Sequence, residues 1–515
     1  MDARELVRRL RRLGEPLHIR REDGALALAP PGAALEPGDA FAPACRPEDL
    51  GDPTFRADHG LRYAYTAGAM ASGIGSAEIA EALGQAGMLA FFGSAGLPLA
   101  QVEAAIERLG RTLAGRPVGY NLIHSPNEPD LEAGLVDLYL RRGVRLVSAS
   151  AYLGLTPAVV KYRVRGLRET PSGEVFAPNR IVATVSRVEV ASRFLAPPPA
   201  GIVADLLARG EVTADEARLA ARIPLAQDLT AEADSAGHTD NRPAIALVPT
   251  LLALRDRLQA EHGYRAPLRV GAAGGIGTPH AAAAAFAMGA AFISTGSVNQ
   301  ACVESGTSAL VREMLAQAQQ ADVAMAPAGD MFEMGVKVQV LKRGTLFPVR
   351  AQKLHDLYRA CRSLEEIPAA DRAALERDLF RAPLEEIWRQ TRAFFETRDP
   401  RQNERAERDP KHKMALVFRW YLGQSSRWAK AGDPARKVDF QVWCGPAMGA
   451  FNEWAAGSPL ERPEGRRVVD VALNILHGAA ALARLNVLRC QGIHLPNDAL
   501  RLPPRTRAEL ERDSE

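Results

Sequence analysis

The sequence predicts an α/β protein built on a closed (β/α)8 TIM barrel, with an additional, mostly helical lid or substrate-binding region. Its 515 residues suffice for one large core and a smaller domain. From residue 61 onward, short apolar or β-branched runs alternate with amphipathic stretches, which is typical of βα units and a parallel sheet. The eight runs lie within about 250 residues, the expected size of such a barrel. An open, doubly wound sheet is the alternative, because periodicity does not reveal closure.

The predicted strands and helices follow one another in order along this part of the chain. The strands cover residues 64–70, 88–92, 117–123, 144–150, 180–186, 224–230, 268–273 and 290–295. Helical periodicity is clearest over 76–86, 99–113, 130–142 and 278–288. Ser76 is the expected N-cap of the first helix, and Thr278 with Pro279 forms an N-cap and first-turn pair for the last. A Pro-rich run at 196–201 and a pair of helices lengthen the fifth connection.

Three regions are expected along the chain. Residues 1–60 form an accessory segment rich in Pro and Gly, and residues 61–345 form the barrel. Residues 346–515 form the mostly helical region. Within it, the strongly charged stretch 398–413 predicts an exposed linker, and 498–515 predicts a frayed tail.

The composition excludes several classes of function. The formal net charge is +3, and no basic block with interleaved aromatic residues occurs, so nucleic acid is not an expected partner. The five cysteines are scattered and lack CxxC spacing, and we find no metal-ligand pattern, so no disulfide framework or metal site is expected. Residues 1–16 lack the apolar core of a secretory signal, and apolar runs such as 281–291 are too short to span a bilayer. We therefore expect a cytoplasmic protein without a membrane partner.

One histidine lies among small residues directly after the sixth predicted strand, in the stretch AEADSAGHTDN (231–241). Active sites of such barrels lie at the C-terminal ends of the strands. An imidazole there suits general acid–base chemistry, which makes His238 the candidate catalytic residue; a hydrogen-bonded structural histidine is the alternative. Glu232 and Asp234 are near enough in sequence to orient its ring, or to cap the next helix.

Two glycine-containing turns follow the last two predicted strands: GGIGTP (274–279) and TGS (295–297). The loops after these strands are the usual phosphate site of the barrel, because backbone N–H groups and a helix N-terminus point at the anion. GGIGTP alone also fits a tight strand-to-helix turn, and the GxGxxG spacing of dinucleotide sites is absent. The two turns together predict a phosphate-bearing cofactor at the mouth of the barrel.

Candidate cofactor-binding residues follow from the same reasoning, because each lies where a predicted strand ends. They are Ala69 and Met70 (first strand), Asn121 (third), Thr184 (fifth), Asp234 and Gly237 (sixth), Gly274 and Gly275 (seventh), and Gly296 and Ser297 (eighth). For Asn121 a buried, hydrogen-bonded amide is an equal alternative, and for Met70 core packing is the commoner role.

Several segments carry a family resemblance that covers about residues 50–492. They include LRYAYTAGAMASGI (61–74), PVGYNLIHSPNEP (117–129), EADSAGHTDNRP (232–243), GAAGGIGTP (271–279), DMFEMGVKVQVLKRGTLFP (330–348) and WCGPAMGAFN (443–452). The chain resembles the PfaD-type trans-acting enoyl reductases of polyketide and polyunsaturated fatty acid synthases, which are relatives of the nitronate monooxygenase barrels. Two positions depart from the family pattern: Ala236 stands where a glycine is common, and Thr184 where a lysine is common.

The resemblance implies a non-covalent FMN at the barrel mouth, reduced by NADPH, with NADH as the other donor. The implied reaction reduces the 2,3-double bond of a 2-enoyl thioester on an acyl carrier protein, and His238 delivers the proton or stabilises the enolate. The helical region would form the acyl tunnel, with Asp330, Glu333 and Lys337 near its root. A local Arg/Lys surface, such as RRVV (466–469), would dock the acidic carrier, and a homodimer is expected for the superfamily.

Two other functions remain open from the sequence. A nitronate monooxygenase would use the same FMN and His238 with oxygen as acceptor, although a small nitronate would not need the long C-terminal region. A barrel that has become a non-catalytic scaffold of a synthase is the second alternative. The Thr184 departure is the hint in that direction.

Overall fold

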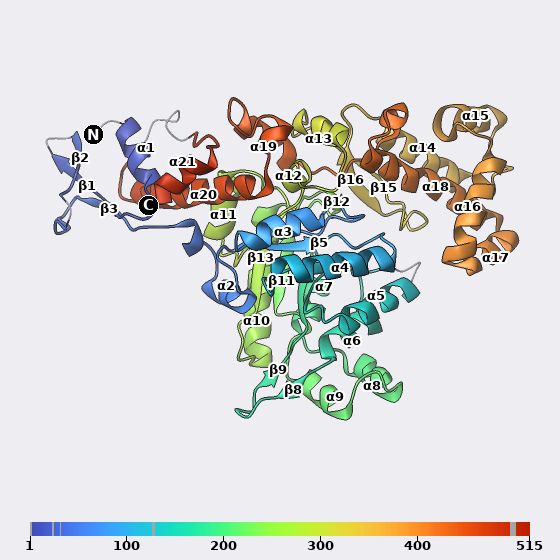
Figure 1. The fold of residues 1–515 in the computed structure, drawn as a ribbon, viewed down its shortest axis with the longest axis horizontal. Helices are drawn as coiled ribbons and strands as arrows, with labels where there is room; N and C mark the ends of the chain where they lie inside the picture. Colours follow the sequence, from blue (N-terminus) through green and yellow to red (C-terminus); the bar gives the residue numbers. More distant parts are fainter. Residues whose placement is uncertain (1–2, 23–24, 31, 126–128, 495–500, 515) are drawn as a thin grey trace. The chain divides into compact units, whose positions relative to one another are not determined.

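The computed structural model describes residues 3–22, 25–30, 32–125, 129–494 and 501–514 (Figure 1). The chain divides into two compact units. Unit 1 comprises residues 1–234, 240–306 and 447–515, and unit 2 comprises residues 235–239 and 307–446. This partition differs from the three predicted regions, because the last 69 residues (447–515) belong to the barrel unit.

Unit 1 contains a closed barrel of eight parallel strands. They are β4 (Tyr65–Ala67), β5 (Leu89–Phe92), β6 (Gly119–Ile123), β7 (Leu146–Ser150), β10 (Arg180–Val185), β11 (Asp228–Glu232), β13 (Arg269–Ala273) and β14 (Ile293–Thr295). The strand order is β10-β11-β13-β14-β4-β5-β6-β7, and β10 pairs with β7 to close the ring. Closure confirms the predicted (β/α)8 barrel and excludes the open sheet.

The sixth strand begins later than predicted. Residues 224–227 are irregular, and β11 starts at Asp228. The backbone N–H groups of Leu225 and Ala226 donate to Ala196 O and Phe194 O, at 2.9 and 2.7 Å, and not to a neighbouring strand. These two apolar residues are fully buried but lie outside the sheet. Their hydrophobicity therefore predicted a strand that begins too early in the sequence.

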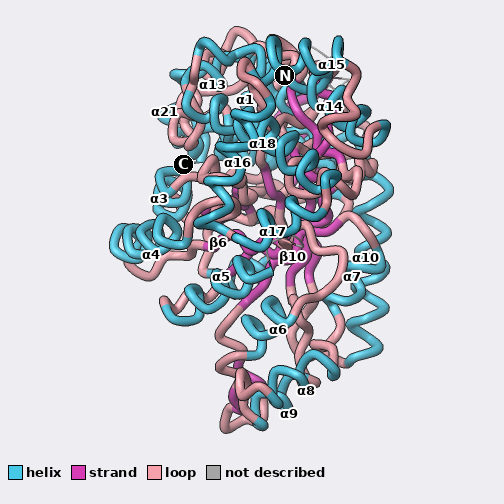
Figure 2. The backbone as a smooth tube through the Cα atoms, turned by 90° about the vertical axis from the view of Figure 1, so that its right-hand side faces the viewer, coloured by secondary structure: helices cyan, strands magenta, loops and turns pink. Residues whose placement is uncertain are grey.

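Helices surround the barrel (Figure 2). They are α3 (Ala77–Gln85), α4 (Leu99–Leu113), α5 (Pro129–Arg141), α6 (Pro157–Val164), α7 (Val188–Leu195), α8 (Ala200–Ala208), α9 (Ala214–Ala220), α10 (Ala244–His262), α11 (Pro279–Ala287) and α12 (Ser297–Gln300). A short ribbon, β8 (Arg168–Glu169) with β9 (Val175–Phe176), precedes β10. The two predicted N-caps are confirmed: the Ile79 N–H donates to Ser76 Oγ (3.0 Å), and the Ala281 N–H to Thr278 Oγ1 (3.3 Å).

The two ends of the chain pack together within unit 1. The N-terminal part holds α1 (Ala3–Arg11), β1 (Leu17–Glu22), β2 (Ala25–Leu28), β3 (Ala40–Ala42), a 3-10 turn (Pro47–Asp49) and α2 (Pro53–His59). The C-terminal part holds α19 (Ala447–Ala455), a 3-10 turn (Pro463–Gly465), α20 (Val468–Cys490) and α21 (Arg507–Ser514). Leu6, Leu10 and Ile19 share one apolar cluster with Leu482 and Leu485. The predicted frayed tail is wrong over α21, because Leu510 is buried; residues 495–500 lie outside the described residues.

Among the described residues, α20 alone has the length and apolar character of a membrane-spanning helix, and 83% of its most apolar stretch is buried inside the fold. Such burial is what the core helix of a globular protein shows.

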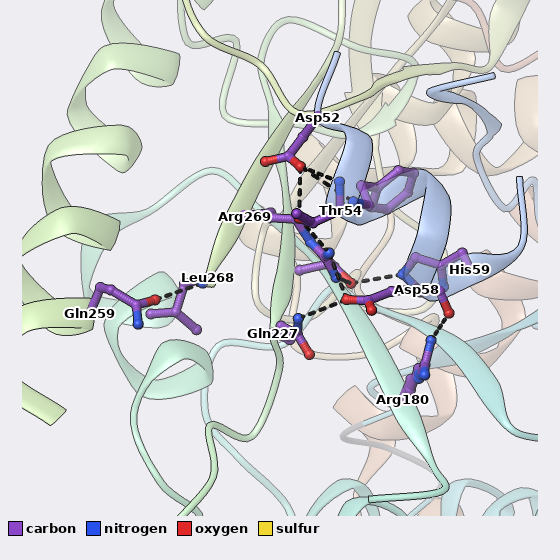
Figure 3. Close-up of polar contacts among 11 residues, drawn as sticks. Asp52, Thr54, Asp58, His59, Arg180, Gln227, Gln259, Leu268 and Arg269 are labelled. Atoms are coloured by element: carbon purple, nitrogen blue, oxygen red, sulfur yellow. Dashed lines mark hydrogen bonds and ion pairs between the residues drawn. The ribbon is translucent and has the colours of Figure 1, made fainter. Parts of the chain in front are cut away.

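A largely buried polar cluster lies at the amino end of the barrel (Figure 3). The Arg269 guanidinium, at the start of β13, donates through Nε to Asp228 Oδ1 (2.6 Å) and through Nη1 to Asp58 Oδ2 (2.7 Å). His59 Nε2 lies 2.9 Å from Asp228 Oδ2. Burial opposes ionisation of Asp228, but His59 and Arg269 lower its pKa below the usual range. This cluster ties α2 to the barrel at the end opposite the expected active site, where barrels serve stability.

Unit 2 combines a small antiparallel sheet with helices. The strand order is β12 (Gly237–His238), β16 (Lys337–Leu341), β15 (Val323–Pro327). The helices are α13 (Ala309–Ala316), α14 (Phe347–Ala360), α15 (Ala369–Ala374), a π-helical segment (Leu375–Phe380), α16 (Leu384–Arg398), α17 (Pro400–Arg408) and α18 (Pro410–Ala431), followed by a 3-10 turn (Pro434–Asp439). The core is aromatic: Phe332, Phe347, Phe418 and Tyr421 are fully buried.

The predicted linker over 398–413 is wrong, because this stretch contains α17 and the start of α18. Two Asp-Pro pairs begin these helices, with Pro400 and Pro410 at the first helical positions. The Asp409 carboxylate also accepts the N–H groups of Lys411 and His412. The helix α17 buries only Asn403 and Ala406, so its sequence carries almost no apolar signal.

Candidate active site

The predicted cofactor residues of unit 1 lie within barrel strands or directly follow their carboxyl ends. Ala69 and Met70 follow β4, Asn121 lies in β6, Thr184 in β10, Asp234 follows β11, Gly274 and Gly275 follow β13, and Gly296 and Ser297 follow β14. Because all eight strands are parallel in one closed ring, these positions belong to a single rim. The topology therefore brings together the residues that were chosen from separate strand ends.

The two glycines after β13 have different local reasons to be glycine. Both have positive φ, +81° at Gly274 and +73° at Gly275. A Cβ at Gly274 would lie 2.6 Å from the Ala233 carbonyl carbon, so this residue permits close approach to the loop after β11. A Cβ at Gly275 would meet nothing within 4 Å, and the same is true at Gly296 after β14. Open space therefore lies beside both turns.

The two residues after Gly275 have backbone N–H groups without an acceptor in the described part of the protein. Ile276 and Gly277 are buried, yet their backbone N–H groups donate to no other residue within the described part of the chain. Buried N–H groups without an acceptor are rare in folded proteins. Just beyond them, Thr278 caps α11. Unpartnered donors, a helix N-terminus and glycines facing open space fit the phosphate of an FMN.

The loop after β4 is held tightly by backbone contacts. The Gly75 N–H donates to Met70 O (2.9 Å), and the Gly73 N–H donates to Gly93 O (2.8 Å). A Cβ at Gly93 would lie 1.7 Å from Met70 O, so only glycine fits there. Met70 itself is only partly buried. The backbone of Ala69 and Met70 is thereby fixed at the rim.

Asn121 and Thr184 lie in β6 and β10, the two strands that pair with β7. The Asn121 side chain is buried, and its Nδ2 donates to Ser150 Oγ (2.9 Å) and Ser148 O (3.3 Å). Its Oδ1 accepts no hydrogen bond from any described residue, so one face of the amide remains available to a ligand. Thr184 Oγ1 lies 3.4 Å from Ser148 Oγ.

A histidine of unit 1, His124, was not predicted as a site residue, although it lies inside the PVGYNLIHSPNEP segment. His124 follows β6, and its Nδ1 lies 3.1 Å from Glu132 Oε2. Tyr152 donates to the other oxygen of Glu132 at 3.0 Å, and Thr156 also donates to it. Burial opposes ionisation of Glu132, but these donors lower its pKa. His124 could have been predicted as a site residue because it directly follows the end of β6.

The loop after β11 is fixed on both sides of residues 235–239. On one side, Asn241 Nδ2 donates to Asp234 Oδ1 (2.9 Å), and the Asp234 N–H donates to Arg242 O (3.0 Å). On the other, Arg187 binds both carboxylate oxygens of Asp240 at 2.8 Å. The hydrogen bonds from Arg187 and Ser186 lower the pKa of Asp240 to about 2. Asp234 is thus engaged in shaping this loop.

Within unit 2, His238 lies on the edge strand β12, opposite Val338 of β16. Its Nε2 is 3.2 Å from Asp330 Oδ1. Gly237 has a φ of +78°, a conformation that favours glycine. Of the other residues expected near an acyl tunnel, Glu333 pairs with Arg419 (3.3 Å), and Lys337 begins β16. The pairing of His238 with Asp330 was not predicted from the sequence, and the orienting or capping role of Glu232 and Asp234 stays a prediction.

Among the described residues, no group of three or more His, Cys, Asp or Glu side chains is arranged to hold a metal ion. The five cysteines are all free.

Comparisons with known proteins place the chain among synthase components. Residues 361–440 match the family model described as acyl-carrier-protein S-malonyltransferase, inserted helical domain. A polyunsaturated fatty acid synthase polypeptide of Thraustochytrium sp. is 49% identical over 452 residues, which is 86% of this chain and 30% of that protein. Polyketide biosynthesis protein PksE of Bacillus subtilis is 44% identical over 479 residues, 93% of this chain and 61% of that protein. The chain thus spans less than two thirds of either relative.

Solved structures give a match over a complete chain. The enoyl reductase domain of MlnA, from the macrolactin biosynthesis cluster of Bacillus amyloliquefaciens, is 44% identical with a TM-score of 0.82. The match covers 86% of this chain and 100% of that one. A mutant of FabK from Thermotoga maritima, 17% identical with a TM-score of 0.51 over 85% of this chain and 98% of its own, shares the fold. The chain therefore belongs to the PfaD-type enoyl reductase family of polyketide and polyunsaturated fatty acid synthases.

Proposed function

We propose that this chain is an FMN-dependent enoyl reductase that acts in trans on 2-enoyl thioesters carried by an acyl carrier protein, with NADPH or NADH as reductant. The observation that carries the proposal is the match to the whole of the MlnA enoyl reductase domain at 44% identity. The relatives from polyunsaturated fatty acid and polyketide synthesis support the same assignment of pathway type.

The cofactor proposal is supported by the rim of the barrel. The N–H groups of Ile276 and Gly277, with the open space beside Gly275 and Gly296, would hold the FMN phosphate. The fixed backbone at Ala69 and Met70 and the Oδ1 of Asn121 would contact the ring system. Bound FMN supplies a group that accepts a hydride from a nicotinamide and passes it to an electron-poor carbon.

The reaction adds one hydride to the β-carbon of the enoyl thioester and one proton to the α-carbon. Negative charge develops on the thioester oxygen as the hydride arrives, so hydrogen-bond donors are needed at that oxygen or at the α-carbon. His238 lies six residues beyond Glu232, the last residue of β11, and is the candidate donor. General acid catalysis of this kind contributes about 10²–10⁴-fold.

Thr184 occupies the position at which the family commonly has a lysine. A threonine hydroxyl donates a hydrogen bond but carries no charge. We propose that Thr184 still contacts the cofactor or substrate, and that Asp234, Gly237, Gly274 and Ser297 also contribute to binding the cofactor. The carrier-protein partner, the homodimer and the cytoplasmic location remain predictions from the sequence.

The proposed function is tested by anaerobic NADPH oxidation with the FMN-loaded protein, with and without crotonyl-loaded carrier protein. Thioester-dependent oxidation that yields the saturated acyl group is the expected result. Flavin reduction without transfer to the thioester, combined with oxygen-dependent oxidation of a nitronate, would favour the nitronate monooxygenase. If the purified protein binds no FMN, the non-catalytic scaffold would be the favoured function.

A further inference from the structure

The backbone of His238 is fixed by the sheet of unit 2. Gly237 and His238 pair with Gln339 and Val338 of β16, and Gln339 Nε2 donates to Ser235 O (2.8 Å). A Cβ at Gly445 would lie 2.9 Å from the Ala236 nitrogen, so another backbone segment also packs closely against residues 235–239. These contacts fix where the imidazole begins, but not which way its ring points.

The ring of His238 contacts the side chain of Asp330, 92 residues further along the chain. Its Oδ1 lies 3.2 Å from His238 Nε2. Asp330 lies in the connection between β15 and β16, which is closed by the Ala328 N–H donating to Val336 O (2.9 Å). Two residues later, fully buried Phe332 packs against Tyr358 and Phe418. The carboxylate is therefore carried by an anchored loop.

The surrounding charges keep Asp330 ionised. Partial burial opposes ionisation, but the hydrogen bond and charge of His238, together with Arg419 of α18, lower the pKa of Asp330. Arg419 also binds Glu333 at 3.3 Å, and Lys337 begins the neighbouring strand β16. No other side chain of residues 235–239 is charged; Asp234 and Asp240 flank the segment in sequence. An ionised carboxylate offers only acceptors, so it is Nε2 that donates.

We propose that Asp330 is the positioning residue for His238. Its carboxylate accepts the Nε2 hydrogen, fixes the plane of the ring, and favours the imidazolium form, so that Nδ1 holds the proton that is delivered to the substrate. This inference rests on the proposed role of His238. The same logic makes a carboxylate the usual partner of a histidine that must hold one tautomer.

The size of the effect follows from distance and exposure. An opposite charge within 4–6 Å shifts a pKa by about 1–3 units. The side chains of His238 and Asp330 are 28% and 48% exposed, so solvent screens their interaction. We therefore expect a pKa shift at the lower end of this range. Asp330→Asn should therefore lower the titration midpoint of His238 by about one pH unit.

The test uses nuclear magnetic resonance of protein labelled with nitrogen-15 in its histidines, with the His238 signal assigned by His238→Gln. Asp330→Asn should lower the His238 midpoint and reduce the population of the Nε2–H tautomer at high pH, whereas Asp330→Glu should restore part of both. Asp322→Asn is the matched control: Asp322 pairs with Arg343 in the same unit, and its loss should leave His238 unchanged.

The second readout is the pH profile of thioester-dependent NADPH oxidation. A general acid must be protonated, so its activity falls as the pH rises through its pKa. In Asp330→Asn this alkaline limb should move to lower pH by about one unit, while reduction of the bound FMN by NADPH keeps its wild-type rate. A purely structural loss would lower the rate at every pH without moving the limb.

The outcomes separate this inference from the proposed function. An unchanged His238 midpoint and tautomer in Asp330→Asn would overturn the inference, whatever the turnover. If Asp330→Asn fails to fold, Asp330→Ser removes the same charge with a smaller side chain, and a His238 midpoint identical to that of wild type in Asp330→Ser would refute the coupling. If His238→Gln leaves thioester reduction unchanged, the catalytic role of His238 fails, and with it the assignment of Asp330 as its positioning residue.

Discussion

Alanine substitutions at the two glycines after β13 allow an effect on FMN binding to be distinguished from an effect on folding stability. Both have positive φ, so alanine at either costs about 1–2 kcal/mol of backbone strain. At Gly275 nothing else is added, because the new Cβ meets no atom within 4 Å. At Gly274 the Cβ would lie 2.6 Å from the Ala233 carbonyl carbon, which adds about 1–3 kcal/mol of overpacking.

Alanine should weaken FMN binding most at Gly275, where open space lies beside the glycine. If the phosphate occupies the space beside Gly275, a methyl group there displaces it from the N–H groups of Ile276 and Gly277. Losing one hydrogen bond to a charged group costs about 1.5–3 kcal/mol, which is about a 10- to 100-fold loss of affinity. Gly275→Ala should therefore weaken FMN binding much more than it weakens the apoprotein.

The assay combines urea unfolding of the apoprotein with FMN titration followed by flavin fluorescence. Gly210→Ala is the matched control, since Gly210 has a φ of +69° and open space but follows α8, away from the strand ends. Gly210→Ala should lower the free energy of unfolding about as much as Gly275→Ala does, and it should bind FMN with wild-type affinity. Wild-type FMN affinity in Gly275→Ala would refute the assignment of this turn as the phosphate site.

Three further substitutions test other parts of the structure. His238→Ala should keep FMN but lower thioester reduction by about 10²–10⁴-fold in steady-state assays, and unchanged turnover would remove His238 from the mechanism. Gly93→Ala places a Cβ 1.7 Å from Met70 O and should cost about 4 kcal/mol or more in thermal unfolding; a wild-type Tm would show that the loop after β4 is not constrained as described. Asp228→Asn leaves buried Arg269 without its main counter-charge and should lower the free energy of unfolding by about 3–5 kcal/mol at neutral pH. Because the pKa of Asp228 is lowered in the fold, this contribution is present above the unfolded pKa of about 3.9 and is lost as the pH falls through the lower folded value, so a pH-independent difference would contradict it.

Features with local signals were predictable from the sequence. Ser76 and the Thr278-Pro279 pair mark helix starts through their own side chains, and both caps are confirmed. The eight strands were found because each buried strand is a short apolar run between turn residues. Gly274 and Gly275 could be predicted as site residues because glycines directly after a barrel strand are typical of a phosphate-binding turn.

Features that depend on distant contacts were not predictable. Leu225 and Ala226 look like a strand, but their backbone bonds to the end of α7 decide otherwise. The helix α17 was taken for a linker because its few buried residues contact neighbours that the sequence does not reveal. The pairing of His238 with Asp330 needs the β15–β16 connection to fold back beside β12, and no local pattern encodes that meeting.

The most direct test of the proposed function is the mass of the acyl carrier protein after one turnover. Crotonyl-loaded carrier is mixed anaerobically with the FMN-loaded protein and NADPH, and the intact carrier is then weighed by mass spectrometry. A gain of the mass of two hydrogen atoms, absent without FMN and strongly slowed in His238→Ala, is the predicted result. A carrier whose acyl mass is unchanged while NADPH reduces the flavin would contradict the assignment as an enoyl reductase.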